Sequence, residues 1–177
     1  MTNYRRARVP GATYFFTVNL ARRDTALLVE RIATLREAVR NVRRRHPFVI
    51  DAMVILPDHL HAIWTLPPDD LDFPLRWRLI KTGFSRGMSC GERRRDSRIA
   101  KGERGIWQRR YWEHLIRDDV DMQRHIDNIH FNPVKHGHAA RAADWPYSTI
   151  HRHIAKGWLL PSWGAASESS IDVGERS

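Results

Sequence analysis

The feature that most constrains the fold is a pair of adjacent strand-forming segments between residues 48 and 66. Residues 48–56 are rich in β-branched and apolar side chains, which is typical of a buried strand. Pro57 and Asp58 follow, and this pair indicates a tight turn. Residues 59–66 have strand character again. The sequence therefore predicts a β-hairpin, with its second strand near the middle of a sheet.

Five further elements surround this hairpin. Apolar and polar residues alternate at 13–20, which predicts a half-buried strand. Helical spacing predicts helices at about 28–45, from Phe73-Pro74 onward, and from Asp118 to Asn132-Pro133; residues 106–116 are predicted as another strand. The order β-α-β-β-α-β-α predicts a ferredoxin-like α+β fold in a single domain.

The composition predicts how the chain is divided. We expect a core at 1–133 that carries a mobile basic insertion at about 87–104. A C-terminal appendage at 134–163 and a disordered tail at 164–177 follow. The insertion and the tail are predicted because their glycine, arginine and polar residues offer little to bury.

Charge points to an anionic partner. The chain of 177 residues has 30 Lys+Arg against 20 Asp+Glu, a net charge of +10, and 26 of the cations are arginine. The arginine fork suits phosphate oxygens, so nucleic acid is the first expectation and an anionic membrane surface the second.

A single cysteine, Cys90, excludes an internal disulfide. The start of the chain does not resemble a signal peptide, and apolar runs shorter than ten residues are too short to span a membrane. We therefore expect a soluble, cytoplasmic protein.

The second hairpin strand carries a candidate metal site. His59 and His61 flank Leu60 and point to one face of a strand, whereas Leu60, Ala62 and Trp64 occupy the opposite face, which suits a core. Two neighbouring imidazoles can bind one divalent cation.

A third ligand for this cation could come from the last helix. Asn132 offers a carbonyl oxygen that suits Mg²⁺ or Mn²⁺. The alternative is that Asn132 only caps the helix before Pro133. Spacing alone leaves both open.

Seven segments of the chain resemble the REP-associated tyrosine transposases, bacterial relatives of the single-tyrosine insertion-sequence transposases with a His-hydrophobe-His motif. The resemblance runs from about Tyr4 to about Trp163. The segments are Tyr4-Arg5-Arg6, Phe15-Phe16-Thr17-Val18-Asn19-Leu20, Leu56-Pro57-Asp58-His59-Leu60-His61, Ile63-Trp64-Thr65-Leu66-Pro67, Ile106-Trp107-Gln108, Trp112-Glu113-His114 and Asn132-Pro133-Val134-Lys135-His136-Gly137.

This resemblance implies a nuclease-type fold and a mechanism. Such enzymes bind single-stranded DNA folded into the imperfect hairpin of a repetitive extragenic palindrome (REP). A divalent metal on the two histidines polarises the scissile phosphate, and a helix tyrosine attacks it to form a 5′-phosphotyrosine. His59 and His61 match the metal histidines, and Asn132 matches the third ligand. The family also implies a monomer or a homodimer, located with the bacterial nucleoid.

The chain departs from the family at the nucleophile. One turn before Asn132 the family has tyrosine, and this chain has Asn128. An amide cannot replace a phenolate as nucleophile, so we expect DNA binding without efficient cleavage. The alternative hypotheses are a binding module that never uses metal, a hydrolase that cuts RNA with a metal-bound water, and Tyr111 as a substitute nucleophile.

DNA binding does not need the tyrosine. We expect phosphate contacts from the basic residues near the N-terminus, before the last strand and after the last helix. Trp112 offers a surface on which an unpaired base could stack, whereas Trp64 is expected in the core. The predicted DNA-binding residues are Arg5, Arg6, Arg8, Arg109, Arg110, Trp112 and Lys135.

Overall fold

The computed structural model describes residues 8–88 and 104–165. Their elements are β1 (Thr13–Asn19), α1 (Leu27–Glu30), α2 (Ile32–Arg45), β2 (Val49–Ile55), β3 (His59–Thr65), α3 (Phe73–Arg86), β4 (Trp112–Leu115), α5 (Asp119–Lys135), the 3₁₀ turn η1 (Ala142–Asp144) and α6 (Ile150–Ala155). The predicted β-α-β-β-α-β-α order is confirmed, with the first helix divided at Arg31. No helix within the two described ranges has the length and apolar character needed to cross a bilayer.

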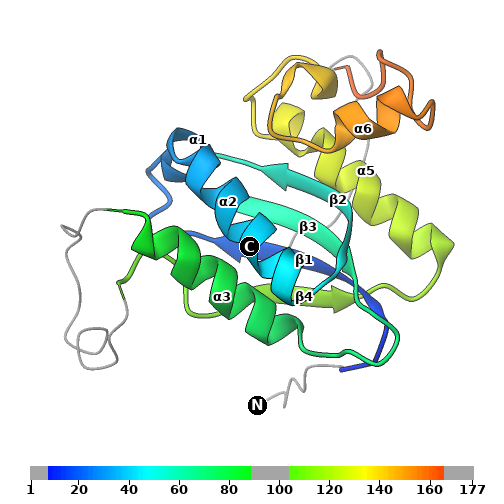
Figure 1. The fold of residues 1–177 in the computed structure, drawn as a ribbon. Coiled ribbons are helices and arrows are strands. Elements are labelled where there is room, and N and C mark those ends of the chain that lie inside the picture. Colours follow the sequence, from blue (N-terminus) through cyan, green and yellow to red (C-terminus); the bar gives the residue numbers. More distant parts are fainter. Residues whose placement is uncertain (1–7, 89–103, 166–177) are drawn as a thin grey trace, which may run out of the picture.

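A four-stranded antiparallel sheet forms the centre of the fold (Figure 1). The strand order is β2-β3-β1-β4, which is the ferredoxin-like arrangement that the sequence predicts. β3 pairs with β1 and β2, so the histidine-bearing strand is internal as expected. Its register sets His59 opposite Asn19 and His61 opposite Thr17.

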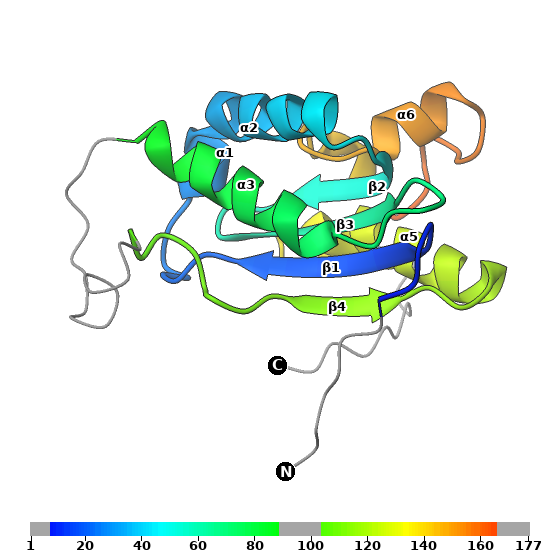
Figure 2. The same cartoon turned by 60° about the horizontal axis from the view of Figure 1, so that its bottom comes forward.

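Helices cover both faces of the sheet. α2 and α3 pack on one face, where Tyr14, Phe16 and Trp64 form the larger apolar cluster (Figure 2). On the other face, Ile129 of α5 contacts a smaller cluster that includes Phe15. Because neighbouring residues of β1 and β3 point to opposite faces, each strand contributes to both layers.

Two predicted boundaries differ from the structure. The predicted strand at 106–116 is reduced to β4, because Trp107 and Tyr111 turn toward α3 and pack on Phe84 and Trp77. Trp107 forms an isolated β-bridge with Leu20.

The second difference concerns the last helix. The prediction that Asn132-Pro133 ends it is wrong, since α5 continues through Pro133 to Lys135. Proline removes one backbone donor, but the next turn still closes because His136 N–H donates to the Asn132 carbonyl over 3.0 Å.

The region after α5 packs along β2, which forms one edge of the sheet. Thr149 N–H donates to Met53 O over 2.8 Å, and Ile55 N–H donates to Tyr147 O over 2.9 Å. The indole N–H of Trp145 donates to Ile55 O over 2.9 Å. The backbone groups of this edge are therefore partly hydrogen-bonded within the chain.

The predicted division of the chain stays a prediction, because most of the insertion and of the tail lies outside the described residues. Gly164 and Ala165, assigned to the tail from the sequence, do contact the body of the protein. Gly164 O accepts a hydrogen bond from Ala142 N–H over 3.3 Å, and Ala165 forms a bridge with Arg141.

Candidate functional site

The two histidines of β3 lie on the sheet face that α5 covers. Leu60, Ala62 and Trp64 point the other way and are buried in the larger cluster, as predicted. His59 and His61 are 4% and 1% exposed, and their ring centroids are 5.0 Å apart. The strand therefore delivers two imidazoles side by side into a nearly dry environment.

Oxygen atoms hold one nitrogen of each ring. His59 Nδ1 lies 2.7 Å from Asp58 Oδ1, and His61 Nδ1 lies 2.9 Å from Thr17 Oγ1. In metal sites such partners fix the ring orientation and direct the other nitrogen to the ion. Burial lowers the pKa of His61 well below its usual value, and the neighbouring His59 and His136 lower it further. A neutral imidazole is the form that binds a cation.

Asp58 is in turn held by Arg23. The Arg23 guanidinium forms an ion pair with the carboxylate that also contacts His59. Burial alone would raise the pKa of Asp58, but hydrogen bonds from His59 and Arg23 outweigh it and lower the pKa. The carboxylate is therefore ionised at neutral pH and orients the His59 ring.

The C-terminal end of α5 approaches these histidines. The ring of His136 lies 5.3 Å from that of His59, centroid to centroid. Asn132 lies one turn earlier and is fully buried, and Asn128 one turn before it is 6% exposed. Because residues four apart share a side of a helix, all three face the same way.

The buried amide of Asn132 fits a role as ligand. Within the described residues, neither its Oδ1 nor its Nδ2 has a hydrogen-bond partner. An unsatisfied amide in the interior costs about 1–3 kcal/mol, and coordination of a cation by Oδ1 would offset part of that cost. Two imidazoles and an amide oxygen form a donor set that can bind a divalent cation. The ligand set His59, His61 and Asn132 stays a prediction.

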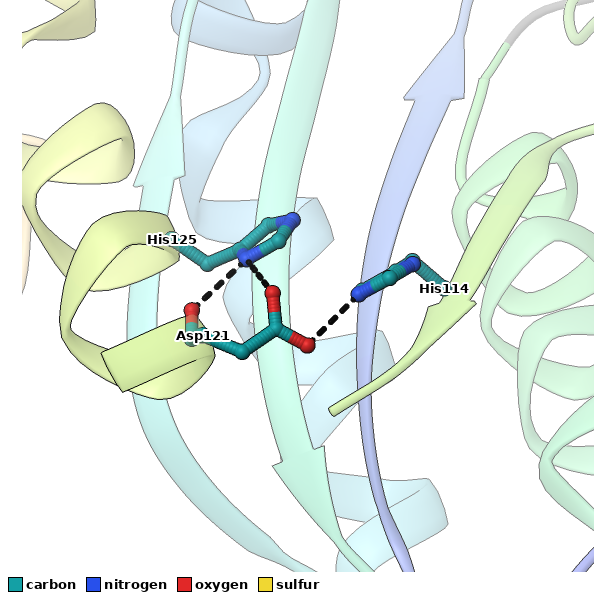
Figure 3. A group of neighbouring side chains, drawn as sticks. All are labelled: His114, Asp121 and His125. Atoms are coloured by element: carbon teal, nitrogen blue, oxygen red, sulfur yellow. Dashed lines mark hydrogen bonds and ion pairs between the residues drawn. The ribbon is translucent and has the colours of Figure 1, made fainter. Parts of the chain in front are cut away.

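A second polar cluster joins β4 to the start of α5 (Figure 3). His114 Nε2 lies 2.8 Å from Asp121 Oδ2, and His125 Nδ1 lies 3.3 Å from Asp121 Oδ1. One ligand atom from each residue falls within 4.8 Å of the others, so the geometry would also admit a cation. The two rings stack with centroids 4.7 Å apart.

Internal hydrogen bonds account for this second cluster. Burial would raise the pKa of Asp121, but hydrogen bonds from His114 and from Arg117 N–H overcome it and hold the pKa at about 2. His125 Nδ1 also lies 2.8 Å from the Asp121 carbonyl oxygen. We interpret the cluster as a clamp between β4 and α5. Sequence reasoning missed it, although the four-residue spacing of Asp121 and His125 is a helical signal.

The predicted DNA-binding residues that the structure describes are exposed. Arg8 precedes β1, Arg109 and Arg110 precede β4, and Lys135 ends α5. The side chain of Trp112 is 51% exposed, and its ring stacks on His114 at 5.8 Å with an interplanar angle of 10°. Arg5 and Arg6 lie outside the described residues.

The described tyrosines pack on the sheet face opposite α5, the helix that carries Asn128. Tyr111 packs toward α3, with its ring 6.1 Å from that of Trp77, on the sheet face opposite α5. Tyr14 is buried in the same cluster, and Tyr147 packs at its margin. Their placement gives no support to a substitute nucleophile among these three.

Comparison with known proteins places the chain among DNA-acting relatives. No family model matches it. A protein of Escherichia coli (strain K12) named REP-associated tyrosine transposase is 44% identical over 176 residues, 99% of this chain and 98% of that one. A relative from Haemophilus influenzae is 40% identical over 173 residues, 97% of this chain and 98% of that one. A solved structure of a REP-associated tyrosine transposase bound to a REP hairpin covers all of this chain and 99% of its own, with 44% identity and a TM-score of 0.82.

Proposed function

Because this chain belongs to the family of REP-associated tyrosine transposases, we propose that it binds the hairpin DNA of repetitive extragenic palindromes and does not cut it efficiently. The observation that carries the proposal is the likeness over the full chain to a relative that was solved with a REP hairpin. The net charge of +10 supports a polyanionic partner. Binding to chromosomal hairpins would locate the protein at the bacterial nucleoid.

His59, His61 and Asn132 would hold a divalent cation, Mg²⁺ or Mn²⁺. When bound, such an ion supplies Lewis-acid polarisation of a phosphodiester oxygen. The protein's own contribution is orientation, since Thr17 and Asp58 fix the two rings. Lys135 and His136, at the end of α5, lie close enough to act electrostatically on His61 and would face a phosphate there.

Asn128 removes the covalent step. It occupies the nucleophile position on the side of α5 that also carries Asn132, and it is 6% exposed. A carboxamide neither ionises to an oxyanion at neutral pH nor forms a phosphate ester that the reverse reaction could reopen. The proposed function is therefore recognition of the hairpin on a site that keeps the family's metal-binding groups.

A cleavage assay tests this proposal. A labelled palindrome hairpin with its single-stranded foot is incubated with the protein and Mn²⁺, and covalent protein–DNA adducts are separated by denaturing electrophoresis. We expect retarded DNA in native gels and no adduct. Efficient adduct formation by the unaltered chain would refute the claim that Asn128 prevents DNA cleavage.

The variant Asn128→Tyr separates two versions of the function. If the metal-binding groups are intact, this variant should form the adduct in Mn²⁺ and lose it in EDTA. If the protein is a binding module that never uses metal, Asn128→Tyr should stay inactive, and His59→Ala should leave hairpin affinity unchanged. The matched control is Asn41→Tyr, which introduces the same side chain on α2.

A further inference from the structure

The clamp of His114, Asp121 and His125 has the geometry of a second metal site (Figure 3). One ligand atom from each residue lies within 4.8 Å of the other two. His114 Nε2 is 2.8 Å from Asp121 Oδ2, and His125 Nδ1 is 3.3 Å from Asp121 Oδ1. Ligand atoms that bind one ion tetrahedrally, each at about 2.0–2.2 Å, are about 3.3 Å apart. The three donors are therefore already near the spacing that a shared ion requires.

The hydrogen bonds of the clamp use the same atoms that would bind the ion. A neutral imidazole carries its proton on either nitrogen, so each ring can present a lone pair to the ion after the proton moves to its other nitrogen. The two rings are stacked, with an interplanar angle of 16°, and one of them must rotate before both lone pairs meet. The His114 side chain is 26% exposed, and the last torsion of a histidine has broad minima, so this ring can rotate.

Charge favours a cation at this position. The Asp121 carboxylate is 5% exposed and accepts hydrogen bonds from the His114 ring and from Arg117 N–H. Arg117 Nε also lies 3.4 Å from Asp121 Oδ2, but its side chain is 69% exposed and can turn into solvent when an ion binds the carboxylate. Two imidazoles and one carboxylate are a donor set for Zn²⁺ and similar transition metals, whereas Mg²⁺ prefers oxygen ligands.

This site differs from the candidate site on β3. In the sheet, β1 lies between β3 and β4, and Phe15 of β1 is 2% exposed. The Phe15 ring packs against His125 with centroids 4.6 Å apart, and against His61 with centroids 5.6 Å apart. An apolar ring thus contacts one histidine of each set. The two sets also differ in charge, because only the set around Asp121 includes a carboxylate.

We propose that His114, Asp121 and His125 bind a transition-metal ion of the Zn²⁺ class, which fastens β4 to the first turns of α5. The bonds of such an ion would fix the start of the helix that carries Asn128 against the edge strand of the sheet. The proposal is independent of the proposed function, because it requires neither DNA nor the metal site on β3.

Imidazole ¹⁵N spectra of the unaltered, tag-free chain test where the ion binds. Zn²⁺ is raised stepwise in a chelator buffer. We expect the resonances of His114 Nε2 and His125 Nδ1 to shift together, with one midpoint concentration of Zn²⁺. Shifts confined to His59 and His61 would assign the ion to the site on β3, and no shift of any histidine would mean that Zn²⁺ does not bind. Either result would overturn the proposal.

Matched variants test whether the residues act as one site. His114→Gln removes one ligand and keeps a polar side chain, and His151→Gln makes the same change at an exposed position of α6. We expect His114→Gln to raise the midpoint of the His125 shift about a hundredfold, since even the loss of an outer-shell partner weakens metal binding about ten- to a hundredfold. His151→Gln should leave the midpoint unchanged. Equal midpoints in the two variants, with the fold checked by circular dichroism, would contradict the proposal.

Discussion

The carboxylate of Asp121 stabilises the contact between β4 and α5. Its folded pKa of about 2 lies below the ordinary value of 3.8, so the ionised form stabilises the fold above about pH 4. That stabilisation, about 2 kcal/mol, is lost as the pH falls from about 4 to 2. We expect Asp121→Asn to lower the free energy of unfolding by this amount at neutral pH, and to converge with the unaltered protein in acid.

Urea unfolding between pH 2 and 7 measures this effect. The control is Asp119→Asn, an exposed carboxylate in the same first turn of α5. It should change stability by less than about 0.5 kcal/mol. An acid decline that is equally steep with and without the Asp121 carboxylate would contradict the assignment.

The cap hypothesis for Asn132 is wrong, since α5 continues past it to Lys135, but its role as a ligand can be tested by substitution. Asn132→Leu replaces two unsatisfied buried atoms by apolar ones of similar volume, so we expect the metal-free protein to gain about 1 kcal/mol of stability. If Oδ1 is a ligand, affinity for Mn²⁺ should fall at least about tenfold. Titration of Mn²⁺ followed by electron paramagnetic resonance gives the affinity, with Asn41→Leu as control. Unchanged affinity for Mn²⁺ would remove Asn132 from the ligand set.

Part of the candidate site could be predicted residue by residue. The alternation of β3 predicts which side chains point to the larger cluster and which to the opposite face, and the structure confirms that Leu60 and His61 point to opposite faces. Only half of the clamp at Asp121 could be predicted, from the spacing of Asp121 and His125, since His114 comes from another element. A carboxylate near a helix start has a sufficient local explanation in the helix dipole.

At the scale of whole elements, the region after α5 stabilises the β2 edge of the sheet through Thr149. Thr149 Oγ1 accepts from Met53 N–H over 2.8 Å and lies 3.1 Å from His130 Nε2. We expect Thr149→Val to cost about 2 kcal/mol, because a backbone donor loses its side-chain acceptor. Thermal or urea unfolding measures the loss, and the exposed Thr82→Val should cost little. A loss below about 0.5 kcal/mol would show that water replaces Thr149 as the acceptor for the Met53 N–H.

The elements that sequence periodicity predicts best are those with long amphipathic or alternating patterns. β1, β2, β3, α2 and α3 follow such patterns and are confirmed. Residues 106–116 have the composition of a strand, but the aromatic rings of Trp107 and Tyr111 pack against Phe84 and Trp77 of α3. At Pro133 the opposite happens. Local propensity predicts that the helix ends there, but the burial of this segment keeps α5 intact.

For the molecule as a whole, charge should control affinity more than any single contact. Because the net charge is +10, we expect hairpin affinity to fall at least about a thousandfold between 50 and 200 mM salt. Anisotropy titrations at four salt concentrations measure the slope. A change of less than tenfold would mean that apolar stacking, as on Trp112, outweighs phosphate contacts.

The bridged edge at β2 has a consequence for self-association. A border strand with open donors and acceptors is a template on which a second copy can extend the sheet. Here Met53 and Ile55 already exchange hydrogen bonds with Tyr147 and Thr149 of their own chain. Growth of a continuous sheet from one molecule to the next is therefore blocked along this part of the rim, and a dimer would have to use other surfaces.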